Sequence, residues 1–318
     1  TNTLTLNNAT IKTGLAYDPD IPGGTLISGA AIGVLNQSGN AELTITLEGT
    51  NTIAEVGKGI YVLASSTSTG GATLTITGGG SLDASASQTA IWVQSNSNNA
   101  TLDIQNAKVE ATGTSTAGYG VNVQSSNSST VSLSVDGGSL TASGSPGILY
   151  DSIGSGTVPD TTALTISNSA LVDARGGGIG AGSLANLQPV SPSGNGIVFN
   201  GDKGTVYGDV TLQEDLEIGE GESLDIPNGA SLTIPNGTTL TNEGTVTNSG
   251  TITNSGTLTN NGTINNSGTL SGNISGTAPP SITTTSLAEG AEDTAYTATL
   301  EAGGNPTSWK ITDGSLPV

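Results

Sequence analysis

The sequence predicts an all-β protein: a right-handed parallel β-solenoid (β-helix) that narrows toward its C-terminal end and is followed by a short C-terminal β segment. Two observations carry this prediction. One unit recurs between residues 42 and 176 with a nearly constant step, and shorter units recur between residues 216 and 270. Within every unit the apolar residues lie at i and i+2, which is the period of a β-strand.

The long units share a leucine followed by alternating apolar residues, as in "TLTITGGGSLDASA" and "TLDIQNAKVEATG". The spacing between copies is nearly constant, with the leading leucines at Leu43, Leu74, Leu102, Leu133 and Leu164. A third apolar segment, such as "KGIYVL" or "TAIWVQ", lies between copies. Three short strands per copy are typical of a stacked solenoid. A β-sandwich is the alternative, but it does not require three matched segments at a constant step.

The short units are octads between positions 216 and 239 and hexads from position 240 onward. Three sides would therefore close a coil of three octads first and a smaller coil of three hexads afterwards. Each hexad supplies one inward aliphatic residue, outward Thr or Asn, and a Gly that turns the corner with φ > 0 at little steric cost. Hexads also occur in left-handed solenoids, so a right-handed continuation is favoured while the hand of these coils stays open.

The chain divides into three predicted regions. Residues 1–275 form the parallel β-helix, and residues 276–289 form a linker rich in Pro, Thr and Ser. Residues 290–318 alternate like strands and form a partial immunoglobulin-like segment whose remaining strands we expect beyond Val318. Because the sequence contains no Met, we also expect residues upstream of Thr1.

Composition excludes several classes of partner. The chain has 26 acidic and 6 basic residues, and its formal net charge is −20. Nucleic acid requires a basic surface, so we expect no nucleic-acid binding. Anionic lipid is disfavoured for the same reason, and no apolar run is long enough to insert into a membrane. The chain has no Cys, so its fold does not depend on disulfides. We expect a monomer.

The segments "LTITLEGTNTI", "GKGIYV", "LTITGGGSL" and "AIWV" resemble bacterial extracellular β-helix proteins that bind carbohydrate or act as adhesins. This resemblance covers residues 1–275 and implies polysaccharide or host-glycan binding at the cell surface or after secretion. The segments "PPSITTTSL", "AYTATL" and "SWKITDGSLP" resemble the opening half of immunoglobulin-like repeats in bacterial surface proteins.

Enzymatic β-helices are mostly polysaccharide lyases and hydrolases, which combine clustered Asp residues with His, Lys or Arg. This chain has no His, and Arg175 is its only arginine. None of the five lysines falls beside an Asp cluster in one strand. We therefore expect no enzyme, although a carboxylate pair alone can serve glycoside hydrolysis, which keeps a lyase or hydrolase as a second alternative.

One outward ladder of the third segment is the candidate ligand site. With Ile and Val inward, the residues between them point outward, in the order Gly33, Tyr61, Trp92, Asn122 and Leu149. Tyr61 and Trp92 would stack sugar C–H faces, and Asn122 would bond sugar hydroxyls. The competing interpretation is that the two aromatic residues pack on each other or under a loop.

Acidic residues give the candidate calcium sites, and no other cofactor is expected. Asp83 and Glu110 would be neighbours on the outer face of the second segment, and Asp18 and Asp20 lie in the loop "YDPDIPGG". Calcium prefers such oxygen ligands. The alternative is a solvated acidic surface, which also describes the stretch "QEDLEIGEGESLD".

The function expected from the sequence is a non-catalytic bacterial surface or secreted protein that binds glycan or mediates adhesion. A passive stalk that displays other domains is the first alternative, because the hexads contain only turn and ladder residues. The residues do not identify the glycan.

Overall fold

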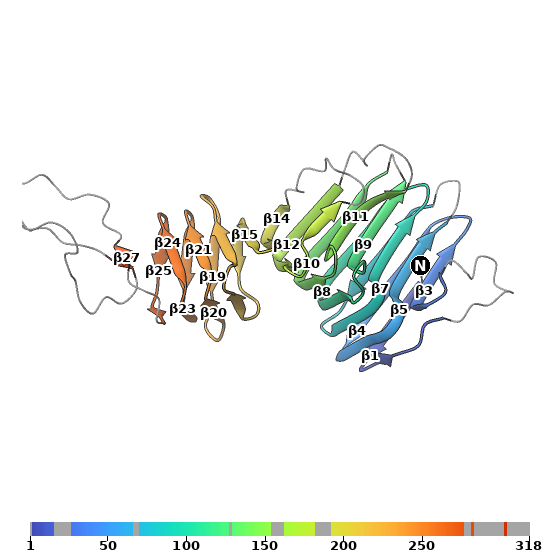
Figure 1. Cartoon of the computed structure of the whole chain (residues 1–318), viewed down its shortest axis with the longest axis horizontal. Helices are drawn as coiled ribbons and strands as arrows, with labels where there is room; N and C mark the ends of the chain where they lie inside the picture. Colours follow the sequence, from blue (N-terminus) through green and yellow to red (C-terminus); the bar gives the residue numbers. More distant parts are fainter. Residues whose placement is uncertain are drawn as a thin grey trace, which may run out of the picture.

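The computed structural model describes residues 2–15, 27–65, 70–126, 129–153, 162–181, 192–276, 281–282 and 302–303. The chain is all-β, with long sheets of parallel strands. Two bodies follow one another along the longest axis in Figure 1, a large stack of β1 to β14 and a small stack of β15 to β26. Within the described residues, no helix reaches the length and apolarity needed to cross a bilayer.

The large stack has three faces, each built from parallel strands. The first face contains β1 (Asn2–Asn7), β4 (Ala41–Glu48), β6 (Ala72–Thr77) and the first halves of β8 (Ala100–Gly113), β10 (Val131–Ser143) and β12 (Thr162–Ala174). The second contains β2 (Thr10–Ile11), the first parts of β5 (Thr50–Ala64) and β7 (Ser81–Ser95), the second halves of β8, β10 and β12, and β14 (Ser193–Asn200). The third contains β3 (Ala30–Asn36), the last parts of β5 and β7, β9 (Tyr119–Ser126), β11 (Ile148–Ile153) and β13 (Ile179–Ala181).

The predicted step between copies is confirmed by the strand register. The five leading leucines pair in succession from β4 to β12 and are almost fully buried: Leu43, Leu74, Leu102, Leu133 and Leu164. Burying one such side chain contributes ~1.5–3 kcal/mol. Every added coil therefore repeats the same stabilisation, and the architecture fits a β-solenoid.

Asn and Gly alternate at the corner between the first and second faces. Asn106, Gly137 and Asn168 have φ values of 51°, 65° and 53° on successive coils. A Cβ on Gly137 would lie 2.7 Å from Oδ1 of Asn106. The Asn106 side chain therefore fills the space on the next coil where Gly137 has no side chain. The same pairing joins Asn8 to Gly49. These two residue types adopt φ > 0 most readily, which explains the pattern.

The small stack has three faces of four strands each. One contains β15 (Lys203–Tyr207), β18 (Ser223–Ile226), β21 (Thr245–Asn248) and β24 (Thr263–Asn266). The second contains β16 (Asp209–Thr211), β19 (Ser231–Ile234), β22 (Thr251–Asn254) and β25 (Thr269–Ser271). The third contains β17 (Leu216–Ile218), β20 (Thr239–Asn242), β23 (Thr257–Asn260) and β26 (Ile274–Ser275).

The predicted narrowing of the small stack is confirmed by its register. Leu216 pairs with Leu240, three octads later, and Leu240 pairs with Leu258, three hexads later. The hexads also contain a second inward position that the sequence analysis does not assign. Asn242 and Asn248 stand where the octads have isoleucine, and both are fully buried.

An antiparallel pair, β14 with β15, interrupts the predicted single solenoid. Val198 on β14 packs into the core of the large stack, whereas Ile197 and Phe199 on the opposite side of the strand belong to the core of the small stack. Strand direction and core side therefore both reverse at this hairpin.

The predicted linker and immunoglobulin-like segment fall mostly outside the described residues. Beyond residue 276 the structure describes only β27 (Ser281–Ile282) and β28 (Ala302–Gly303), which pair antiparallel. The three-region division stays a prediction.

Candidate functional site

Tyr61 on β5 and Trp92 on β7 are register partners on the third face, as the sequence analysis expects. Their rings stack on each other, with centroids 4.6 Å apart and planes inclined by 21°. Each ring therefore covers one face of the other. Both rings lie near a cation, because Lys58 Nζ is 5.3 Å from the Tyr61 centroid and 5.9 Å from the Trp92 centroid.

Tyr61 is not the exposed aromatic residue that sugar stacking requires. Only 4% of its surface is exposed, and it packs with Ile27, Leu35 and Leu63. Its hydroxyl donates a 2.6 Å hydrogen bond to Oε1 of Gln94. Burial raises the pKa of Tyr61, and it lowers the pKa of Lys58. The interpretation that the two aromatic residues pack on themselves accounts for Tyr61.

Trp92 and Asn122, the other two predicted ligand residues, are neighbours on adjacent coils. Trp92 is half-buried, and Asn122 on β9, its register partner, is 3% exposed. Nε1 of Trp92 and Oδ1 of Asn122 are buried and lack a hydrogen-bond partner among the described residues. A donor and an acceptor thus stand on adjacent coils next to an aromatic ring.

The acidic ladder has the predicted register. Asp83 pairs with Glu110, Glu110 with Thr141, and Thr141 with Asp173. Asp83 and Glu110 are exposed, and the described residues contain no group of three metal-ligating side chains. Calcium binding there stays a prediction. Asp18 and Asp20, the other predicted calcium ligands, lie outside the described residues.

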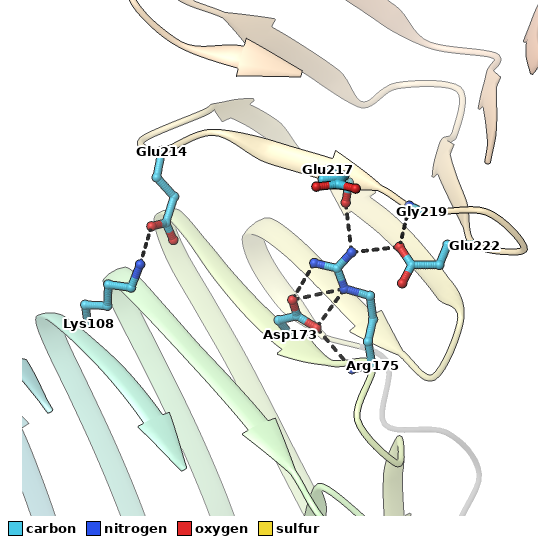
Figure 2. A network of polar contacts seen from close by, with 7 residues as sticks. All are labelled: Lys108, Asp173, Arg175, Glu214, Glu217, Gly219 and Glu222. Atoms are coloured by element: carbon cyan, nitrogen blue, oxygen red, sulfur yellow. Dashed lines mark hydrogen bonds and ion pairs between the residues drawn. The ribbon is translucent and has the colours of Figure 1, made fainter. Parts of the chain in front are cut away.

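Asp173 instead belongs to an ion-pair network between the two stacks (Figure 2). Arg175 Nη2 lies 2.6 Å from Asp173 Oδ2, and Arg175 Nη1 lies 2.7 Å from Glu222 Oε2. Nη1 also donates to the carbonyl oxygen of Glu217 at 2.8 Å. The guanidinium lies 4.5 Å from the centroid of the Phe199 ring. The single arginine therefore connects both stacks and the hairpin between them.

The hydrogen bond and charge of Asp173 raise the pKa of Arg175, and those of Glu222 add to this effect. The Arg175 side chain is 25% exposed, and those of Asp173 and Glu222 are 11% and 21% exposed. Limited contact with water strengthens such bonds. These contacts connect one cation with two carboxylates across the junction.

A second ion pair crosses the same junction (Figure 2). Lys108 Nζ on β8 lies 3.0 Å from Oε2 of Glu214, which precedes β17. The hydrogen bond to Glu214 raises the pKa of Lys108. A cleft of about 220 Å³ lies beside this pair, between the Gly-rich corner of the large stack and residues 212–216.

This junction could not be predicted from the sequence, for a physical reason. Arg175 and Glu222 are 47 residues apart, and Lys108 and Glu214 are 106 residues apart. Their contact depends on the reversal at the hairpin, which places the acidic stretch "QEDLEIGEGESLD" against the last coils of the large stack. The only signal available was the presence of one arginine before a segment rich in Glu.

Comparison with protein families, curated proteins and solved structures gives no match for this chain. The resemblance to bacterial carbohydrate-binding β-helix proteins therefore stays a prediction, and function is inferred from the residues of this chain alone.

Proposed function

We propose that this chain is a rigid, non-catalytic spacer in a bacterial extracellular or cell-surface protein, built from two right-handed β-helices fixed end to end. The observation that carries the proposal is the Arg175 network, which connects the last full coil of the large stack to the first coil of the small one.

Two features support stiffness along the long axis. Backbone hydrogen bonds link each strand to the equivalent strand of the next coil, and one sheet of 18 strands includes strands of both stacks. At the hairpin, β14 and β15 remain paired through five residue pairs. Bending at the junction would separate Arg175 from Glu222 and withdraw Phe199 from the core of the small stack. Such bending is costly because it exposes apolar surface and leaves charges unpaired.

The distance between two spin labels tests this proposal. The chain has no Cys, so Gln88→Cys and Glu243→Cys, both at exposed positions, would place one label on each stack. We expect a single narrow distance distribution in the parent chain and a broader one after Arg175→Gln. The Lys12→Gln control, which removes an exposed ion pair within the large stack, should leave the distribution unchanged. A broad distribution in the parent chain would refute a rigid spacer.

Glycan binding at Trp92 is the second candidate function. It is favoured by the unpaired Nε1 of Trp92 and the unpaired Oδ1 of Asn122, a donor and an acceptor that suit sugar hydroxyls, both without a partner among the described residues. A glycan array comparing the parent chain with Trp92→Phe tests it, because phenylalanine retains an aromatic ring beside Tyr61 but lacks the N–H donor and the smaller ring of the indole. Binding that is lost in Trp92→Phe supports this site. If the chain binds no plant, bacterial or host glycan, the spacer is the only one of the two candidate functions that remains.

A further inference from the structure

The cleft at the junction has an apolar floor. Leu171 on β12, Ile197 on β14 and Leu212 before β17 contribute to it. Ile197 and Leu212 are also members of the small-stack core and are only 2% and 6% exposed. The floor is therefore held in place before any ligand arrives, and such preformed apolar surfaces favour aliphatic groups.

The rim of the cleft is charged, with more acidic than basic groups. Lys108 pairs with Glu214, and both side chains are partly open to solvent, at 50% and 38% exposure. Asp215 also lines the cleft, and Glu110 acts on Lys108 electrostatically. Two carboxylates and one ammonium thus line the cleft, in a chain of formal net charge −20. A field of this sign attracts cations.

We propose that this cleft binds a primary alkylammonium group, with its aliphatic stem on the Leu171–Ile197–Leu212 floor and its ammonium on Glu214. Lysine side chains show the same division, with the stem against apolar surface and the head in water. The incoming ammonium competes with Lys108 for the Glu214 carboxylate. A free aliphatic amine and a lysine side chain of another protein both carry this chemistry. The proposal does not depend on the spacer function.

Calorimetric titration of the full chain with n-pentylammonium chloride tests the proposal. Two further probes separate the parts of the ligand: n-pentanol has the stem without the charge, and methylammonium has the charge without the stem. We expect each to bind at least about tenfold more weakly than n-pentylammonium, because each lacks one of the two contacts. Equal binding of n-pentanol would overturn the proposal.

Two variants should change the affinity for n-pentylammonium in opposite directions. Glu214→Gln should weaken binding about tenfold, since a charged hydrogen bond is lost. Lys108→Gln should strengthen binding several-fold, because the internal competitor is removed. Glu243→Gln removes one negative charge from an exposed position away from the cleft and should change the affinity less than about twofold. Unchanged binding in Glu214→Gln, or weaker binding in Lys108→Gln, would overturn the proposal.

Thermal unfolding of each variant checks that the fold is retained. If Glu214→Gln unfolds, Glu214→Asp provides the second variant: it keeps the charge on a shorter side chain and should bind with intermediate affinity, whereas loss of all binding with the fold intact would contradict the proposal. A final titration with Nα-acetyl-lysine methylamide identifies the source of the ligand. Affinity equal to that of n-pentylammonium assigns the cleft to lysine side chains, and no binding assigns it to free amines.

Discussion

At the scale of single residues, each stack buries a polar atom that has no hydrogen-bond partner among the described residues. Asn248 in the small stack donates through Nδ2 to Oδ1 of Asn266 at 2.7 Å and to the carbonyl oxygen of Thr269 at 2.9 Å. Its own Oδ1 has no partner among the described residues, because the coil before it has Ile226 at that position. In the large stack, the hydroxyl of Tyr150 is buried and also lacks a partner there.

The Tyr150→Phe variant should reveal the cost of that hydroxyl. At pH 7 the free energy of unfolding should stay unchanged or rise by about 1 kcal/mol, because no hydrogen bond among described residues is lost. Burial raises the pKa of Tyr150, so the hydroxyl ionises more readily in the unfolded chain than in the folded one. The ionisation of Tyr150 therefore has no effect on stability below the unfolded-state pKa of about 10 and lowers the free energy of unfolding as pH rises above it. Urea unfolding should show that the free energy of unfolding falls between pH 9 and pH 11 by about 1 kcal/mol less in Tyr150→Phe than in the parent chain. An equal loss in both proteins would contradict this.

At the scale of elements, the β14–β15 hairpin determines how the stacks meet. Phe199 on β14 is fully buried in the small-stack core, and Gly204 on β15 is its register partner. A Cβ on Gly204 would overlap the Phe199 ring. The glycine is therefore required by the close approach of the ring.

Replacing Gly204 with alanine should displace Phe199 and lower the free energy of unfolding by about 1–3 kcal/mol, the usual cost of overpacking. Hydrogen exchange measured by mass spectrometry should show faster exchange in β15 and β18, with β4 to β8 unchanged. Gly79→Ala is the matched control, since a Cβ there meets no atom within 4 Å. Faster exchange throughout the large stack would contradict a local role for the hairpin.

Elements that depend on local repetition could be predicted from the sequence, and elements that depend on contacts across the chain could not. The Leu102 and Leu258 ladders follow from a fixed step, so their register was correct. The hairpin was missed because β14 has apolar residues on both sides, a pattern that does not reveal a change of core. The outward direction of Tyr61 was predicted, and its burial agrees with the competing interpretation. The repeat pattern gives the direction of a side chain but not how closely residues such as Leu35 and Leu63 pack against it.

At the scale of the whole molecule, two separate hydrophobic cores are joined by one hairpin, two ion-pair contacts and further hydrogen bonds among the residues that the structure describes. Arg175 is the main electrostatic link, with bonds to Asp173, Glu222 and the Glu217 carbonyl. Stacks of repeats unfold cooperatively when the interfaces between neighbours are strong. The junction is thus the interface that decides whether the two cores unfold together.

Scanning calorimetry of Arg175→Gln should show two transitions where the parent chain shows one. The loss of bonds to partly buried carboxylates should lower the free energy of unfolding of the small stack by about 1–3 kcal/mol. Lys12→Gln breaks an ion pair whose side chains are 59% and 67% exposed, and should cost no more than about 0.5 kcal/mol. A single, equally cooperative transition in Arg175→Gln would show that the hairpin and the remaining contacts, such as Lys108–Glu214, couple the cores without Arg175.

The near-identity of the hexads makes the length of this protein adjustable by simple gene duplication. Adding three hexads of the kind between Leu240 and Leu258 inserts one complete turn and moves everything after it about 4.8 Å farther along the axis, with its orientation kept. Adding a single hexad retains the aliphatic ladder but rotates the following chain by one face. Copy number in steps of three hexads therefore sets reach, and single hexads set the direction in which the next segment points.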